Sequence, residues 1–214
     1  MTAVYFISGL GADESVFGRL TLKKELLVHH LPWLIPNADE SMESYATRMA
    51  ESIVDPEQSV LVGLSFGGIM AIEIAKRTPV KTVVLISSVK SKSEIPAKLN
   101  LIGLLNLQKL LPASKLLHFK ELTSWFFGVR EGSDKSMLNH VLEHSDERLV
   151  DWSADQIVTW QGEHHLQNIV QIHGTADAVF PIRNIRPDRV VKGGPHFMVY
   201  THSSEVSDWL NETI

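Results

Sequence analysis

The sequence contains no cysteine among its 214 residues. Disulfide bonds, thiolate metal sites and a cysteine nucleophile are therefore excluded. An excess of basic residues is also lacking, because 20 Lys and Arg oppose 25 Asp and Glu, and the formal net charge is −5 at pH 7. The basic residues are scattered along the chain, so we expect no nucleic-acid partner. A reducing cytoplasm is compatible with this composition, and a cytoplasmic location is the expectation.

Long apolar runs are missing as well. The most apolar region, residues 99–111, is interrupted by Gly103 and by polar residues such as Lys109. It is therefore shorter than the roughly 18 apolar residues that cross a bilayer, and we expect no membrane span. Residues 1–7 lack the basic start and the cleavage site of a secretory signal, and we expect them to contain the first strand.

What the chain does contain is an alternation of short apolar runs with segments of helical period. This alternation is typical of a parallel sheet with crossover helices. The length favours one domain, residues 1–214, with an α/β fold and a mostly parallel central sheet flanked by helices. Six strands are predicted, at residues 3–8, 26–31, 59–64, 82–87, 168–173 and 189–191.

Helices are predicted between these strands. Residues 41–53 have apolar residues on one face and a capping serine at Ser41 or Ser44, and a second helix is expected at 67–76. In residues 91–165 the alternation stops and several helices follow, with starts expected near Ser133-Asp134 and Ser145-Asp146. We interpret this segment as a helical insertion that overhangs one end of the sheet as a lid.

The segment Gly63-Leu64-Ser65-Phe66-Gly67 has the pattern G-x-S-x-G and lies between an apolar strand and an apolar helix. In this context the serine occupies a sharp turn, and the glycines two residues before and after it let strand and helix approach. Ser65 is therefore the predicted nucleophile, with the Phe66 N–H as an oxyanion donor. The alternative is a glycine-rich bend with an idle serine.

A serine hydroxyl reacts only when a base removes its proton and a third group orients the base. Asp177 follows the strand predicted at 168–173, and His196 follows the strand predicted at 189–191. Both are expected at the carboxyl end of the sheet, where open α/β sheets build their sites. We predict Asp177 as the acid and His196 as the base.

Four segments resemble motifs of the α/β-hydrolase superfamily. Residues 63–67 resemble the nucleophile elbow, residues 173–181 the loop that carries the acid, and residues 194–197 the histidine loop. The resemblance implies a trimmed α/β-hydrolase fold, whose sheet begins at the family's third strand, and acyl-enzyme chemistry. Residues 8–13 resemble the first oxyanion loop, which implies the Leu10 N–H as second donor, although Ser8 replaces the usual histidine.

Other residues compete for these roles. His173 is an alternative base, and Glu94 is an alternative acid, whereas Asp188 precedes its strand and lies at the wrong end of the sheet. His140 and His144 would share a helix face as metal ligands do, but a third ligand is not apparent. We expect no metal and no cofactor.

The expected substrate is a small, mainly apolar ester, and the expected activity is that of a carboxylesterase. Candidate pocket residues are Leu10, Phe66 and Trp125. Alternatives on the same scaffold are a carbon–carbon bond hydrolase, a lyase, a perhydrolase and a receptor without turnover. The apolar residues of the insertion could also contact lipid, but helices that cap a sheet are expected to bury such residues. The sequence predicts no oligomeric state.

Overall fold

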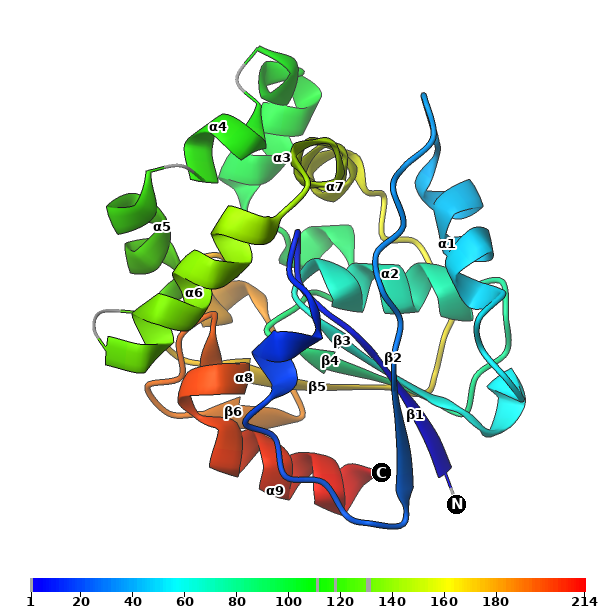
Figure 1. Ribbon diagram of the computed structural model, residues 1–214. Helices are drawn as coiled ribbons and strands as arrows, with labels where there is room; N and C mark the ends of the chain where they lie inside the picture. Colours follow the sequence, from blue (N-terminus) through cyan, green and yellow to red (C-terminus); the bar gives the residue numbers. More distant parts are fainter. Residues whose placement is uncertain (1, 111, 118, 130–131) are drawn as a thin grey trace.

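The computed structural model describes residues 2–110, 112–117, 119–129 and 132–214. Its centre is a six-stranded sheet in the order β2-β1-β3-β4-β5-β6, and every neighbouring pair is parallel (Figure 1). The strands are β1 (Thr2–Ile7), β2 (Leu26–His30), β3 (Val60–Leu64), β4 (Thr82–Ile86), β5 (Ile169–Gly174) and β6 (Arg189–Val191). All six predicted strands are present, and the predicted fold class is confirmed.

Alternate residues of the strands face two hydrophobic cores, as the period of a strand requires. In β1, Tyr5 and Ile7 belong to the core under α1 (Met42–Ala50) and α2 (Phe66–Ala75). Val4 and Phe6 belong to the core on the other face, under α8 (Met198–Thr201) and α9 (Ser203–Thr213). The sheet is thus the middle layer of three.

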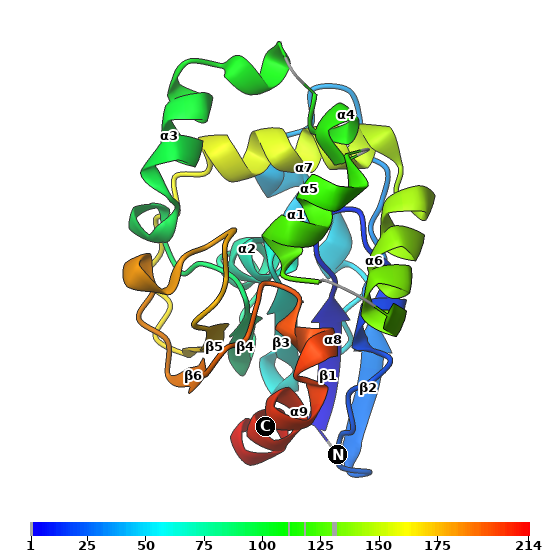
Figure 2. The same ribbon diagram turned by 90° about the vertical axis from the view of Figure 1, so that its left-hand side faces the viewer.

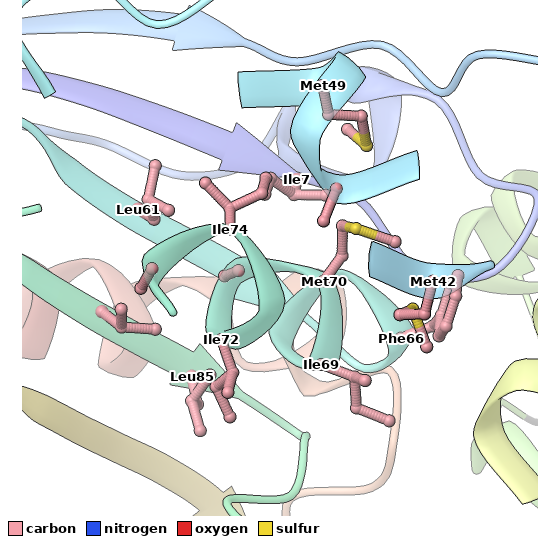
Figure 3. Packing of buried hydrophobic residues seen from close by; sticks show 14 of the residues in the cluster. Ile7, Met42, Met49, Leu61, Phe66, Ile69, Met70, Ile72, Ile74 and Leu85 are labelled. Atoms are coloured by element: carbon pink, nitrogen blue, oxygen red, sulfur yellow. The ribbon is translucent and has the colours of Figure 1, made fainter. Parts of the chain in front are cut away.

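Helix α2 is buried along its whole length. Figure 3 shows Ile72 directed toward Leu85 of the sheet and Met70 directed toward α1. A helix that packs on both sides needs an apolar surface all round, which explains why its sequence shows no polar face.

The predicted helix 41–53 is shorter in the structure. Helix α1 ends at Ala50, and the Ser41 hydroxyl caps its start by accepting a hydrogen bond from the Ser44 N–H at 3.2 Å. Ile53 is buried although it lies in the turn after the helix. Its apolar character therefore reflects core packing, and the periodic pattern extended the prediction too far.

The described part of residues 91–165 is helical and contains no strand. Its α-helices are α3 (Ala97–Leu104), α4 (Ala113–Leu117), α5 (Lys120–Phe127), α6 (Gly132–His144) and α7 (Glu147–Thr159). We call these five helices with their connections the cap.

Short 3₁₀ helices occur along the whole chain and are η1 (Glu14–Phe17), η2 (Pro56–Gln58), η3 (Lys92–Glu94), η4 (Leu107–Lys109) and η5 (Ile182–Asn184). Helix α7 begins as predicted, because Asp146 accepts hydrogen bonds from the N–H groups of Arg148 and Leu149.

Two tryptophans fasten α7 to the rest of the molecule. The Trp152 indole N–H donates to the Glu40 carbonyl oxygen at 2.8 Å, and the Trp160 indole N–H donates to Glu73 Oε1 at 2.8 Å. Burial raises the pKa of the Glu73 carboxyl, but hydrogen bonds from Lys76, Trp160 and Arg77 lower it to a net value below its usual range. The cap is therefore anchored to an ionised, fully hydrogen-bonded carboxylate.

No helix in the described ranges is long and apolar enough to cross a membrane.

Candidate active site

The turn between β3 and α2 holds Ser65 in a strained conformation. Its φ and ψ angles are 52° and −119°, which a residue with a side chain rarely adopts. The turn also needs glycine on both sides. A Cβ added at Gly63 would lie 2.4 Å from the Gly67 carbonyl oxygen. A Cβ added at Gly67 would lie 2.3 Å from the carbonyl oxygens of Ile7 and Ser8. The sharp turn leaves the Ser65 side chain at the carboxyl edge of the sheet.

The structure brings the three residues of the predicted triad together. His196 Nε2 lies 2.9 Å from Ser65 Oγ, and His196 Nδ1 lies 2.8 Å from Asp177 Oδ2. An ionised carboxylate only accepts hydrogen bonds, so the proton is on Nδ1 and the free Nε2 can accept the Ser65 proton. These residues follow β3, β5 and β6, so the parallel sheet sets their mutual positions.

Asp177 is held as a carboxylate. Its Oδ1 accepts hydrogen bonds from the N–H groups of Val179 and Phe180, both at 2.8 Å. Burial raises the pKa of Asp177, but the nearby His196 and hydrogen bonds from His173 and His196 lower it far below its usual range. The Asp177 carboxylate is therefore ionised next to the His196 ring.

His173 is a neighbour of the acid and not of the serine. Its Nε2 donates to the Phe180 carbonyl oxygen at 2.7 Å and lies 3.3 Å from Asp177 Oδ2. The side chain is completely buried, and Nδ1 has no hydrogen-bond partner among the described residues. This arrangement makes His173 a structural contact of the loop that carries Asp177 and does not favour the alternative of His173 as the base.

The loop predicted to carry the Leu10 donor is closed by hydrogen bonds to its carbonyl oxygens. The Ser8 hydroxyl donates to the Ala12 carbonyl oxygen, and the Trp33 indole N–H donates to the Gly9 carbonyl oxygen at 3.0 Å. Ser8 thus orders the loop in place of the usual histidine. Within the described chain, neither the Leu10 nor the Phe66 backbone N–H donates a hydrogen bond, so both are free to bind an oxyanion.

Comparison with known proteins yields structural matches only. No protein-family model and no curated protein matches the chain. Solved structures match over 99% of it. A bromoperoxidase from Bacillus anthracis matches at 16% sequence identity and a TM-score of 0.69, and the match covers 91% of that chain. An esterase from Exiguobacterium antarcticum matches at 16% sequence identity and a TM-score of 0.65, and the match also covers 91% of that chain. A mutant N-acyl homoserine lactonase complexed with N-hexanoyl homoserine lactone matches at 16% and 0.71, covering 89% of that chain. The chain has the fold of the α/β-hydrolase superfamily.

A small cavity adjoins the serine and histidine of this α/β-hydrolase fold. Its volume is about 40 Å³. The sheet side contributes Gly9, Leu10, Ala12, Val16, Leu64, Ser65, His196 and Phe197, and the cap contributes Phe127, Leu138, Val141 and Leu142. Apart from Ser65 and His196 the lining side chains are apolar, so the site can surround a small apolar group next to the nucleophile.

Two predicted pocket residues need correction. Leu10 lines the cavity as expected, but the Phe66 side chain does not: it is fully buried in the core and stacks on Trp33 with ring centroids 5.2 Å apart. Trp125 is 65% exposed and packs edge-on against Phe126 outside the cavity. Of the apolar residues 125–127, the third faces the site. Phe127 is the last residue of α5, and its ring packs edge-on against the His196 ring with centroids 5.2 Å apart.

Helix α6 contributes to the cavity wall, which was not among the expectations from the sequence. Leu138, Val141 and Leu142 are spaced as one helix face, which was the available signal for an inward-facing wall. Leu142 also lines a second cavity of about 330 Å³ with Ser114, Lys120, Glu143, Ser145, Glu147 and Val150. Leu142 therefore borders both spaces.

The rival residues lie elsewhere. Glu94 Oε2 accepts a hydrogen bond from the Lys90 N–H at 2.6 Å, and Asp188 pairs with the Lys90 ammonium at 3.2 Å. His140 and His144 do lie on one exposed helix face, with ring centroids 4.2 Å apart and the rings tilted by 42°. In the ranges that the structure covers, no group of three or more potential ligands could hold a metal ion.

Proposed function

We propose that the chain is a serine hydrolase that cleaves small, mainly apolar carboxylic esters through an acyl-enzyme. The observation that carries the proposal is the unbroken hydrogen-bond chain from Ser65 Oγ to His196 and on to Asp177, at 2.9 and 2.8 Å. Further support comes from the strained turn that presents Ser65 and from the backbone N–H groups of Leu10 and Phe66, which donate no hydrogen bond within the described chain. The likeness to an esterase and a lactonase is in keeping with ester chemistry.

In the first half-reaction Ser65 Oγ attacks the ester carbonyl carbon, and His196 Nε2 takes the hydroxyl proton. The charge that forms on the carbonyl oxygen is bound by the N–H groups of Leu10 and Phe66. Removal of one such donor typically costs about 100-fold to 1000-fold in rate. The intermediate then collapses, the carbon–oxygen bond to the alcohol breaks, and His196 returns the proton to the leaving alcohol.

In the second half-reaction His196 removes a proton from water, and the hydroxide attacks the acyl carbon on Ser65. Collapse releases the carboxylic acid and returns the proton to Ser65 Oγ. Throughout, Asp177 stabilises the imidazolium, and edge-on contacts with Phe127 and Phe180 restrict rotation of the ring.

The size of the cavity sets the expected substrate. The cavity volume of about 40 Å³ is small compared with the roughly 300–1,000 Å³ of typical ligand pockets. A short acyl chain fits this space, and a long chain requires movement of α6. We therefore expect acetyl and propionyl esters to be preferred over esters of longer acids.

The deciding experiment is labelling with a fluorophosphonate probe and peptide mass mapping, with Ser65→Ala as control. The proposal expects one adduct on Ser65 and none in the variant, together with hydrolysis of p-nitrophenyl acetate that the variant loses. Well-folded protein that takes no label and turns over no ester would contradict the proposal. A parallel panel of thioesters, cyanohydrins and diketones separates ester hydrolysis from the carbon–carbon hydrolase and lyase reactions, and a peracid assay covers perhydrolysis.

A further inference from the structure

The outer helices of the cap expose apolar side chains that a water-soluble cap normally buries. Leu104 and Leu110 are 77% and 81% exposed, and Trp125 is 65% exposed. Among the described residues of α3, η4, α4, α5 and their connections, the exposed large apolar side chains are Leu101, Leu104, Leu105, Leu107, Leu110, Leu116, Phe119, Leu122, Trp125 and Phe126. We call this set the outer cap surface. Large exposed apolar areas mark interaction sites.

The helices that carry the outer cap surface are neighbours. Helix α3 contacts η4 and α7, and α4 contacts α5 and α7. In both views α3 and α4 lie at the end of the molecule opposite the two termini (Figures 1 and 2). The exposed residues therefore belong to one continuous part of the cap.

Polar side chains in the same segment point the other way. The Gln108 amide donates to Asp155 Oδ1 at 2.8 Å. Ser114 donates through its N–H to Asp151 Oδ1 at 2.8 Å and through its hydroxyl to Oδ2 at 3.0 Å. Both acids lie on α7, so Gln108 and Ser114 face inward while leucines of the same segment face outward. The exposed leucines indicate an apolar environment outside the cap.

The charges beside these leucines that form no ion pair are positive, whereas the exposed Glu121 on α5 pairs with Lys135 at 2.8 Å. Lys98 and Lys109 are exposed, and neither forms an ion pair with another described residue. Farther along, Lys115 and Lys120 pair with Glu147 and Glu143 on the inner helices. A basic apolar surface on a chain of net charge −5 is complementary to negatively charged lipid headgroups.

We propose that the outer cap surface docks on the interface of an anionic phospholipid bilayer. The leucines would enter the boundary between headgroups and acyl chains, Trp125 would lie at headgroup depth, and Lys98 and Lys109 would contact lipid phosphates. A symmetric dimer through the same surface is an alternative that the oligomeric state in solution distinguishes. The proposal goes beyond the ester chemistry and does not depend on Ser65.

The test is flotation of the purified protein with vesicles of phosphatidylcholine alone and of phosphatidylcholine mixed with phosphatidylserine. We expect the protein to float with the mixed vesicles, to float less with phosphatidylcholine alone, and to be released by salt. Lys98→Gln combined with Lys109→Gln should weaken partitioning about fivefold for each lysine. Leu104→Ser combined with Leu110→Ser should weaken it on the order of tenfold or more.

The matched control is Val54→Ser, which removes an apolar side chain that is 69% exposed outside the cap. It should float as the wild type does, and so should Ser65→Ala. The leucine variant should still hydrolyse a soluble short ester at the wild-type rate without vesicles. Loss of flotation and loss of esterase activity therefore report on separate proposals.

Three results would overturn the docking proposal. One is absence of flotation with either kind of vesicle, which would leave a protein partner as the occupant. Another is equal weakening by Val54→Ser and by the leucine variant. The third is a wild-type dimer in light scattering that the leucine variant converts to a monomer, because a second copy would then cover the surface.

Discussion

The hydroxyl of Ser145, at the junction of α6 and α7, lies 2.7 Å from the carbonyl oxygen of Gly11 in the loop of residues 8–13 and 2.7 Å from the carbonyl oxygen of Val141. Ser145 and Gly11 are 134 positions apart in the chain and meet only because the cap folds over the sheet. The contact is tight, since a Cβ at Gly11 would lie 2.7 Å from Ser145 Oγ. The cap therefore holds the loop that presents the Leu10 N–H.

Ser145→Ala should lower kcat of ester hydrolysis about fivefold to tenfold and leave KM nearly unchanged. The reason is that loss of one hydrogen bond to the loop loosens a donor that acts in the transition state, and such a bond contributes about 1 kcal/mol. Steady-state kinetics with p-nitrophenyl acetate measure both parameters. Ser136→Ala, an exposed hydroxyl on α6, is the control and should leave kcat unchanged. A purely structural role would lower the melting temperature without changing kcat.

Asp177 makes stability dependent on pH in the acid range. Its pKa in the folded chain lies below the unfolded value of about 3.9, so its contribution is complete above about pH 4 and is lost as pH falls toward the folded pKa. Asp177→Asn removes this contribution. Urea unfolding should therefore show a larger difference in free energy of unfolding between wild type and variant at pH 7 than at pH 3. An equal difference at both values would show that the charge of Asp177 does not stabilise the fold. In a working triad the same variant also lowers kcat by about 10⁴-fold.

Leu142→Ala should widen the range of accepted acyl chains. Leu142 borders both the 40 Å³ cavity beside Ser65 and the 330 Å³ cavity between the cap helices, and its truncation is expected to join them. The ratio of kcat/KM for p-nitrophenyl hexanoate to that for the acetate should rise on the order of tenfold. Leu116→Ala makes the same change on the exposed side of α4 and should leave the ratio as it is. An unchanged ratio in Leu142→Ala would place the acyl group elsewhere.

Glu73→Gln should destabilise the protein by about 2 kcal/mol, because it removes the charge that Lys76 and Arg77 contact and disturbs the hydrogen bond from Trp160. Glu147→Gln breaks an exposed pair with Lys115 and should cost less than about 0.5 kcal/mol. Chemical denaturation measures both values. Similar costs for the two variants would mean that the Glu73 contacts do not anchor the cap.

The strands and the positions of Ser65, Asp177 and His196 were predictable because both follow from local patterns. Apolar runs with β-branched residues mark buried parallel strands, and a polar residue just after such a strand must lie at one edge of the sheet. The structure places the three side chains within hydrogen-bond distance of each other. Their catalytic roles stay a prediction that the Ser65→Ala experiment addresses.

The cap was less predictable because apolar composition does not say which way a side chain faces. Trp125 and Phe127 are two positions apart on one short helix, yet one is exposed and the other packs on His196. Likewise, the expectation that cap leucines are buried is wrong for Leu104 and Leu110, since the inner side of their segment is occupied by polar contacts to α7. Such choices depend on contacts between distant segments.

The contacts of α7 also distinguish two parts of the cap: an outer segment bound to α7 and the helices that line the cavity beside Ser65. Gln108 and Ser114 of the outer segment bind its acids, while the walls of the reaction cavity come from α6 and the end of α5. The outer segment, residues 97–117, can therefore vary without altering the walls of the cavity beside Ser65. A chimera that exchanges this segment, and keeps partners for Asp151 and Asp155, should change binding to vesicles and leave the proposed ester hydrolysis unchanged.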